Sequence, residues 1–155
     1  MAKHFSFVLI DVEPISQNNR SAAMVSNMGV TLTQWYDHKY ITKRGGTTSM
    51  PRTAIDPLTA KVFYIHRISD KKDADNISKP MWDALNGRAY LDDRQVKYLE
   101  TLKIQLSTPD LHELDVSGMD DDDFDELIDF LGDVNKDRFL YIEICELECK
   151  NVRFT

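Results

Sequence analysis

The chain has 155 residues, of which 42% are hydrophobic, and this size favours a single domain spanning residues 1–155. No stretch approaches the roughly 18 unbroken apolar residues of a membrane helix, and the first residues alternate instead of forming the apolar block of a signal peptide, so we expect an intracellular protein. The formal net charge of −7 does not exclude binding to nucleic acid, because residues 1–107 carry 15 Lys and Arg against 11 Asp and Glu, whereas residues 108–155 carry 4 against 15.

The N-terminal part of the chain predicts two strands and a helix. Residues 5–12 are apolar and rich in β-forming side chains, which predicts a strand that ends before Pro14. Residues 22–26 are compatible with a second, short strand. Apolar and aromatic side chains then recur at helical spacing over residues 30–43, although three threonines weaken the helix prediction there.

A loop is predicted over residues 44–60, which contain paired glycines, two prolines and several threonines. Lys43, Arg44 and Arg52 flank the loop or lie within it. Two interpretations are open for this cationic, acid-poor segment: contact with a DNA backbone, or an ordinary solvated loop.

Three further strands and one further helix are predicted in the C-terminal part. The strands cover residues 61–69, 96–107 and 138–148. Between the last two, residues 124–133 have apolar side chains at i, i+3, i+4 and i+7, which predicts an amphipathic helix within an acidic segment.

Residues 73–95 concentrate the side chains that suggest chemistry. Asp73 and Asp75 are two residues apart, so in an extended chain leaving a strand both carboxylates would point to one side. Asp92 and Asp93 return after a helix. Carboxylates gathered around one point offer the hard oxygen ligands that Mg²⁺ prefers, and such an ion supports phosphodiester hydrolysis. The alternative is that these aspartates act only as caps and turn formers.

The helix between these aspartate pairs is expected to begin at a cap formed by Asn76 and to end at Gly87, with Pro80 in its first turn. Lys79 and Asp83 fall on a stripe away from the apolar face of this helix. From that position Lys79 is a candidate to neutralise charge on a scissile phosphate or to orient the attacking water.

The run D-x-D-N-x-x-K-x-x-x-D-A-L-N-G-x-x-x-x-D-D-x-Q, from Asp73 to Gln95, resembles the signature of the RusA family of Holliday junction resolvases. The upstream P-x-x-x-N-N-R, from Pro14 to Arg20, is similar to the N-terminal turn of that family. The VSNMG segment at residues 25–29 resembles the point where the family passes into its first helix.

The resemblance implies a small α+β subunit, with a mixed β-sheet and two main helices, that pairs into a symmetric homodimer. It implies an endonuclease that binds four-way junction DNA and makes paired, symmetric nicks with Mg²⁺ or Mn²⁺, in DNA recombination and repair. A cytoplasmic, nucleoid-associated protein is expected, and a phage or prophage origin fits the family.

The resemblance also implies roles for individual residues. The essential acidic residues of the family correspond to Asp73, Asp75 and Asp93, which would bind the metal, and its important lysine corresponds to Lys79. Supporting roles are expected for Asn76, Asp83 and Asp92. The candidate contacts to the DNA backbone are Arg20, Lys43, Arg44, Arg52, Lys71 and Lys72.

An acidic insertion at residues 107–138, including the run Asp120–Asp123, departs from the short link expected before the last strand. Three interpretations are open: a solvated helical insertion facing away from DNA, a self-inhibitory element that mimics DNA near the active cleft, or a helix for dimerisation or partner binding through Phe124, Leu127, Ile128 and Leu131. The insertion also leaves a second function open, that of a non-catalytic junction-binding or regulatory protein with the same fold.

Overall fold

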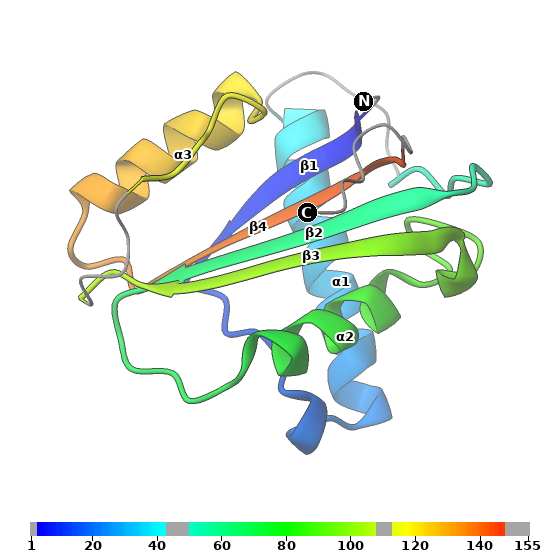
Figure 1. Cartoon of the computed structure of the whole chain (residues 1–155), viewed down its shortest axis with the longest axis horizontal. Coiled ribbons are helices and arrows are strands. Elements are labelled where there is room, and N and C mark those ends of the chain that lie inside the picture. Colours follow the sequence, from blue (N-terminus) through cyan, green and yellow to red (C-terminus); the bar gives the residue numbers. More distant parts are fainter. Residues whose placement is uncertain (1–2, 43–49, 108–112, 148–155) are drawn as a thin grey trace, which may run out of the picture.

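The computed structural model of the chain describes residues 3–42, 50–107 and 113–147, which form a four-stranded mixed sheet with helices on both faces (Figure 1). The strands are β1 (Lys3–Ile10), β2 (Leu58–His66), β3 (Val96–Gln105) and β4 (Arg138–Glu146), in the order β1-β4-β2-β3. β4 is antiparallel to both β1 and β2, whereas β2 and β3 are parallel. The parallel pair follows from the crossover through a helix, α2 (Ala74–Leu85), that connects them.

The two faces of the sheet are covered by different helices (Figure 1). On one face α1 (Ala22–Asp37) and α2 enclose the main core, to which β1 contributes Phe5 and Phe7. On the other face α3 (Asp121–Gly132) covers a smaller core, where Leu127 and Phe130 meet side chains such as Val8 of β1. The strands therefore alternate between two apolar faces, as expected for a sheet buried on both sides. This confirms the predicted α+β class, with two main helices and an acidic helix before the last strand.

The strand expected over residues 22–26 is wrong, because these residues form the first turns of α1. Ser21 is the N-cap of the helix, and its hydroxyl accepts a hydrogen bond from the amide of Met24. The capped turn overrides the weak β preference of a short segment. α1 ends at Asp37 and is followed by a π-helical turn, η2 (His38–Thr42), so the predicted helix exists but begins earlier than expected.

α2 also begins earlier than expected. Its first residue is Ala74 and its N-cap is Asp73, so Asp75 lies in the first helical turn and not in extended chain. Asn76 is therefore not the cap, and Pro80 lies inside the helix and not in its first turn. The predicted end is confirmed, because the helix stops at Leu85 and Gly87 follows with a φ of +76°.

The strands predicted at residues 5–12, 61–69, 96–107 and 138–148 correspond to β1, β2, β3 and β4. β2 begins at Leu58, inside the predicted loop 44–60, of which residues 44–49 lie outside the described residues. None of the helices in the described ranges is both long and apolar enough to span a membrane.

Candidate functional site

The loop from the end of β2 to α2 is held by a buried carboxylate, Asp70, whose side chain is only 4% exposed. It accepts hydrogen bonds from the hydroxyl of Tyr64 at 3.0 Å and from the amide of Lys72 at 2.9 Å, and its ion pair with the ammonium of Lys72 measures 3.2 Å. Lys103 of β3 donates to the carbonyls of Asp70 and Lys72. Burial alone would raise the pKa of Asp70, but these hydrogen bonds outweigh it and lower that pKa. The loop therefore has a defined path into α2.

That path delivers two exposed carboxylates, Asp73 and Asp75, at the N-terminal end of α2. Asp73 occupies the N-cap position, but its side chain makes no capping hydrogen bond. Within the described part of the chain, neither carboxylate has a hydrogen-bond or ion-pair partner. Both are thus available to a ligand at the N-terminal end of the helix.

Lys79, one turn further along α2, is held between two carboxylates. Its ammonium lies 2.6 Å from Oδ1 of Asp83 and 3.5 Å from Oδ2 of Asp93. The hydrogen bond with Asp83 is the main cause of the raised pKa of Lys79, so this lysine is a fixed positive charge. Asp83 also forms an ion pair with Arg20, and although burial opposes ionisation, the two cations lower the pKa of Asp83. Asp75, Lys79 and Asp83 share one stripe of α2 at i, i+4 and i+8.

Asp92 and Asp93 stand at the start of β3 in a short 3-10 turn, η3 (Asp93–Gln95). The side chain of Asp92 accepts from the amide of Arg94 and forms a capping box with Gln95. Gln95 is buried and links the turn to residues 50–57 by donating to the carbonyls of Thr53 and Ile55 at 3.1 and 2.7 Å. Asp92 therefore has a capping role, and Gln95, which ends the signature, is a positioning residue that spacing alone did not identify.

The three predicted metal ligands do not gather around one point in this chain. In residues 3–42, 50–107 and 113–147, no three His, Cys, Asp or Glu side chains form a group that could hold a metal ion. A physical reason is the early start of α2, because residues two positions apart at a helix start do not share a face as they would in an extended strand. The donor chemistry nevertheless fits Mg²⁺, which is commonly bound by one or two carboxylates with water and substrate phosphate completing its shell.

The predicted backbone contacts, Arg20, Lys43, Arg44, Arg52, Lys71 and Lys72, differ in their surroundings. Arg20 is paired with Asp83, and Lys72 with Asp70 and with Glu13 at 2.8 Å. Lys71 and Arg52 are exposed, and Lys43 and Arg44 lie outside the described residues.

A groove between α1 and α2 adds a cation, Arg88, that the sequence analysis missed. The groove has a volume of about 490 Å³ and is bordered by Arg20, Ser21, Asp83 and Arg88. Arg88 packs across α1 at Gly29, where an added Cβ would lie 2.5 Å from Nε of Arg88. Its guanidinium has no hydrogen bond or ion pair to the described residues. The glycine of the VSNMG segment is the sequence signal for this close approach.

Comparison with known protein families gives a match, which assigns the chain to a family. The sequence model of a family described as Endodeoxyribonuclease RusA matches residues 11–112, which is most of the chain and includes all of residues 73–95 but not α3. No curated protein sequence matches the chain. The family match confirms the resemblance found in the sequence, and the chain belongs to the RusA family of endodeoxyribonucleases.

Proposed function

We propose that this protein is a structure-selective endonuclease that resolves Holliday junctions by metal-dependent hydrolysis of opposed phosphodiester bonds, at the nucleoid. The family assignment supports nuclease action on junction DNA. The observation that carries the proposal is the placement of Lys79 between Asp83 and Asp93, on the stripe of α2 that begins with the exposed Asp75.

Asp75 and Asp93, assisted by Asp73, are the residues that would hold Mg²⁺ or its substitute Mn²⁺. When bound, the ion supplies the positive charge that activates water and stabilises the leaving oxygen. Lys79 contributes a second, permanent positive charge that faces the scissile phosphate. Asp83 keeps Lys79 extended toward Asp93, and the capping box of η3 keeps Asp93 in place.

The groove between α1 and α2 supports a path for the DNA backbone away from the cleaved bond. Asp83 borders this groove and also contacts Lys79, so the groove and the candidate catalytic residues form one continuous surface. Successive phosphates on one strand advance only about 3.4 Å along the helix axis. A phosphate close to the scissile one would therefore meet Arg88 and the pair formed by Arg20 and Asp83.

We further propose a symmetric homodimer, because a symmetric junction must be cut on two opposed strands. The two edges of the sheet differ in a way that supports a subunit contact at β3. At the β1 edge, the backbone groups of Ser6 are already hydrogen-bonded to side chains, because its amide donates to the hydroxyl of Tyr40 and its carbonyl accepts from Lys39. On β3, by contrast, Tyr98 and Leu99 are 41% and 54% exposed.

A nicking assay on a synthetic four-way junction tests the proposal, with linear duplex as the substrate control. Wild-type protein should make paired nicks only with Mg²⁺ or Mn²⁺. Asp75→Asn should abolish nicking while junction affinity stays the same or rises, since the change removes a metal ligand and one negative charge. An Asp75→Asn protein that nicks junctions at the wild-type rate would refute the assignment.

A non-catalytic junction-binding protein with the same fold is the second candidate, and it is favoured by the acidic α3, which lies outside the family match and offers a surface for partners. Titration with Mg²⁺ followed by thermal unfolding separates the two candidates. The enzyme should be stabilised by Mg²⁺ in the wild type and not in Asp75→Asn, whereas the non-catalytic protein should respond to Mg²⁺ equally in both.

A further inference from the structure

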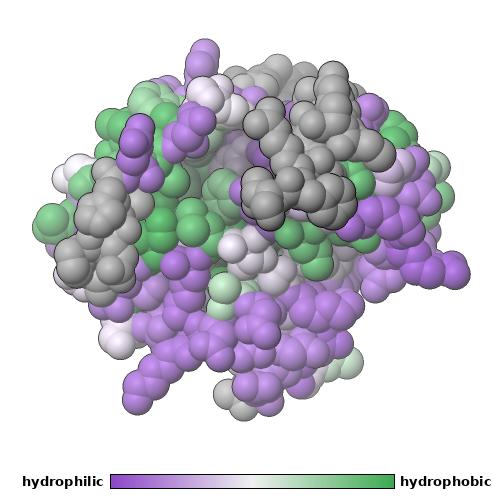
Figure 2. Space-filling view, in the orientation of Figure 1, coloured by the Kyte–Doolittle hydropathy of each residue, from purple (hydrophilic) through white to green (hydrophobic). Residues whose placement is uncertain are grey.

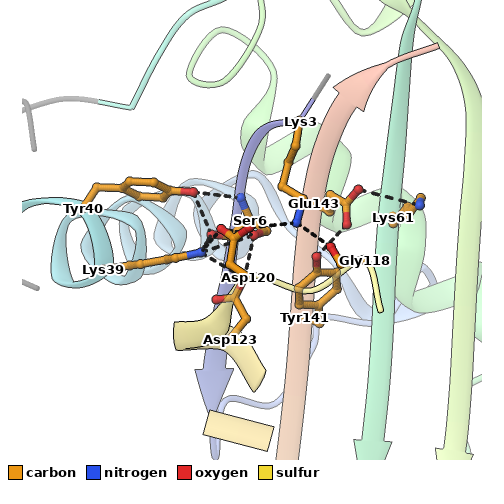
Figure 3. Close-up of polar contacts among 10 residues, drawn as sticks. All are labelled: Lys3, Ser6, Lys39, Tyr40, Lys61, Gly118, Asp120, Asp123, Tyr141 and Glu143. Carbon is orange, nitrogen blue, oxygen red and sulfur yellow. Dashed lines mark hydrogen bonds and ion pairs between the residues drawn. The ribbon is translucent and has the colours of Figure 1, made fainter. Parts of the chain in front are cut away.

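α3 is fastened to the sheet by a buried ion cluster at its N-terminal end (Figure 3). The ammonium of Lys39 lies 2.9 Å from carboxylate oxygens of both Asp120 and Asp123, and it donates to the carbonyl of Ser6 at 2.7 Å. Further along the helix, Leu127 and Phe130 are buried against the sheet. This inner face is fully occupied, so the helix is a fixed part of the fold.

The outer face of α3 carries a second apolar stripe that nothing in the described chain covers. Phe124, Ile128 and Leu131 are 38%, 50% and 44% exposed, and they follow one another at i, i+4 and i+7. Val134, just beyond the helix, is 77% exposed. Over the region of α3, Figure 2 shows hydrophobic side chains interspersed with hydrophilic ones. Single exposed apolar residues are ordinary, but a continuous stripe is typical of an interaction site.

Acidic side chains line this stripe and restrict what can cover it. Asp121, Asp125 and Asp129 are exposed on the neighbouring stripe at i, i+4 and i+8, and α3 contains no Lys or Arg. Such a surface repels a phosphate backbone, so it is not a second DNA site. Two copies of α3 placed face to face would bring like charges together, which opposes a dimer contact here.

We propose that the outer face of α3 binds a basic amphipathic segment of a partner protein. Apolar side chains of that segment would pack on Phe124, Ile128 and Leu131, and its Lys or Arg residues would pair with Asp121, Asp125 and Asp129. The family match ends at residue 112, before α3, and none of the candidate nuclease residues lies on this helix, so the proposed cleavage reaction does not account for this surface.

Selection of random peptides displayed on phage, with the full-length chain as bait, tests the proposal. The selected peptides should combine Lys and Arg with large apolar residues. Synthetic versions should bind the double variant Ile128→Ser/Leu131→Ser at least about tenfold more weakly than the wild type. Val30→Ser, at a residue of α1 that is 46% exposed, is the matched control and should bind normally. Asp125→Asn/Asp129→Asn should weaken binding and reduce its dependence on salt.

Several outcomes would overturn the proposal. Failure to select any peptide, or peptides that bind the Ile128→Ser/Leu131→Ser variant as well as the wild type, would show that the stripe is not a docking surface. Concentration-dependent self-association that this variant abolishes would make a second copy the occupant.

A segment of the chain itself is another alternative occupant, because residues 148–155 include the basic and apolar residues Lys150, Arg153 and Phe154. Peptide binding that appears only after their removal would make that segment the occupant. Nicking by the wild type is measured separately, so these results do not depend on the proposed catalytic site.

Discussion

At the scale of single residues, Asp70 shows how a site can depend on a side chain outside its motif. It precedes the D-x-D-N run by three positions, and nothing in the sequence separates it from an ordinary loop aspartate. Its importance comes from long-range contacts, because Tyr64 and Lys103 approach from two different strands. Sequence spacing does not reveal such contacts, whereas Asp73, Asp75 and Lys79 were found because their spacing is itself the signature.

Asp70→Ala should therefore lower the free energy of unfolding by about 2 kcal/mol, since it leaves Lys72 and Tyr64 without their buried acceptor. Urea denaturation measures the change, with Asp129→Ala on the exposed surface of α3 as the control.

The lowered pKa of Asp70 fixes the sign of the pH dependence of this contribution to stability. The contribution of Asp70 is present above the unfolded-state pKa of about 4 and is lost as the pH falls. An equal difference between wild type and variant at acidic and neutral pH would contradict this account.

Arg88 gives a second prediction at this scale. Arg88→Ala should weaken binding to junctions of any sequence, and the slope of log affinity against log salt should decrease by about 0.9, as expected for one lost phosphate contact. Lys136→Ala, which removes one charge from the turn after α3, is the control and should leave the slope unchanged. Binding is measured without divalent metal, so that cleavage does not interfere. A slope that Arg88→Ala does not change would exclude the groove between α1 and α2 from the DNA path.

At the scale of elements, the four strands were predictable because each is rich in β-branched, aromatic and other apolar residues, whereas the helix starts were not. Asp73 and Asn76 are both residue types that cap helices well. Because Asp73 and Asp75 were expected in extended chain, Asn76 was the predicted cap. The structure instead starts α2 at Ala74, after a loop fixed by Asp70. The early start of α1 at Ala22 has a different origin, because Ser21 caps it locally and most side chains of its first turns are exposed, so no apolar periodicity marks them as helical. The start of α2 thus depended on contacts that local patterns do not contain, whereas the start of α1 rests on a local cap.

The attachment of α3 gives a prediction for a whole element. Lys39→Ala should lower the free energy of unfolding by about 3 kcal/mol, because it leaves the carboxylate of Asp123, which is 1% exposed, without its charge partner. The double variant Lys39→Met/Asp123→Leu should recover much of this loss, since apolar replacements of a buried pair are often tolerated and Asp120 keeps Lys3 at 3.1 Å. A double variant less stable than Lys39→Ala would contradict this explanation.

The two carboxylates of this cluster, Asp120 and Asp123, contribute to the pH dependence of stability with opposite signs. Burial raises the pKa of Asp123, whereas Asp120, despite some burial, is held by Lys39 and Lys3 at a pKa of about 2. The contribution of Asp120 is complete above its unfolded-state pKa of about 4 and is lost as the pH falls toward 2. The contribution of Asp123 has the opposite sign, because the folded state holds its proton at higher pH. In Lys39→Ala, Asp120 lacks one of the two cations that lower its pKa. The free energy of unfolding of this variant in acid, followed by circular dichroism, should therefore depend less on pH than that of the wild type.

At the scale of the whole molecule, the net charge of −7 conceals two surfaces of different character. The candidate nuclease residues belong to α2, η3 and the loop after β2, and the exposed acidic stripe belongs to α3 on the opposite face of the sheet (Figure 1). Of the three interpretations of the insertion, this arrangement favours a helix that faces away from DNA, and it leaves partner binding open. It does not favour a DNA mimic lying in the active cleft.

Neutralising α3 tests this separation directly. The triple variant Asp121→Asn/Asp125→Asn/Asp129→Asn should change junction affinity by less than about threefold at 0.15 M salt. The Debye length there is about 8 Å, while an α-helix alone is about 10 Å across and the sheet adds its own thickness. The charges of α3 are thus screened from DNA bound over α2. Binding measured at lower salt should show a larger effect, because screening then weakens. An increase of more than about tenfold at 0.15 M salt would instead mean that α3 competes with DNA, and the self-inhibitory interpretation would replace the one favoured by the fold.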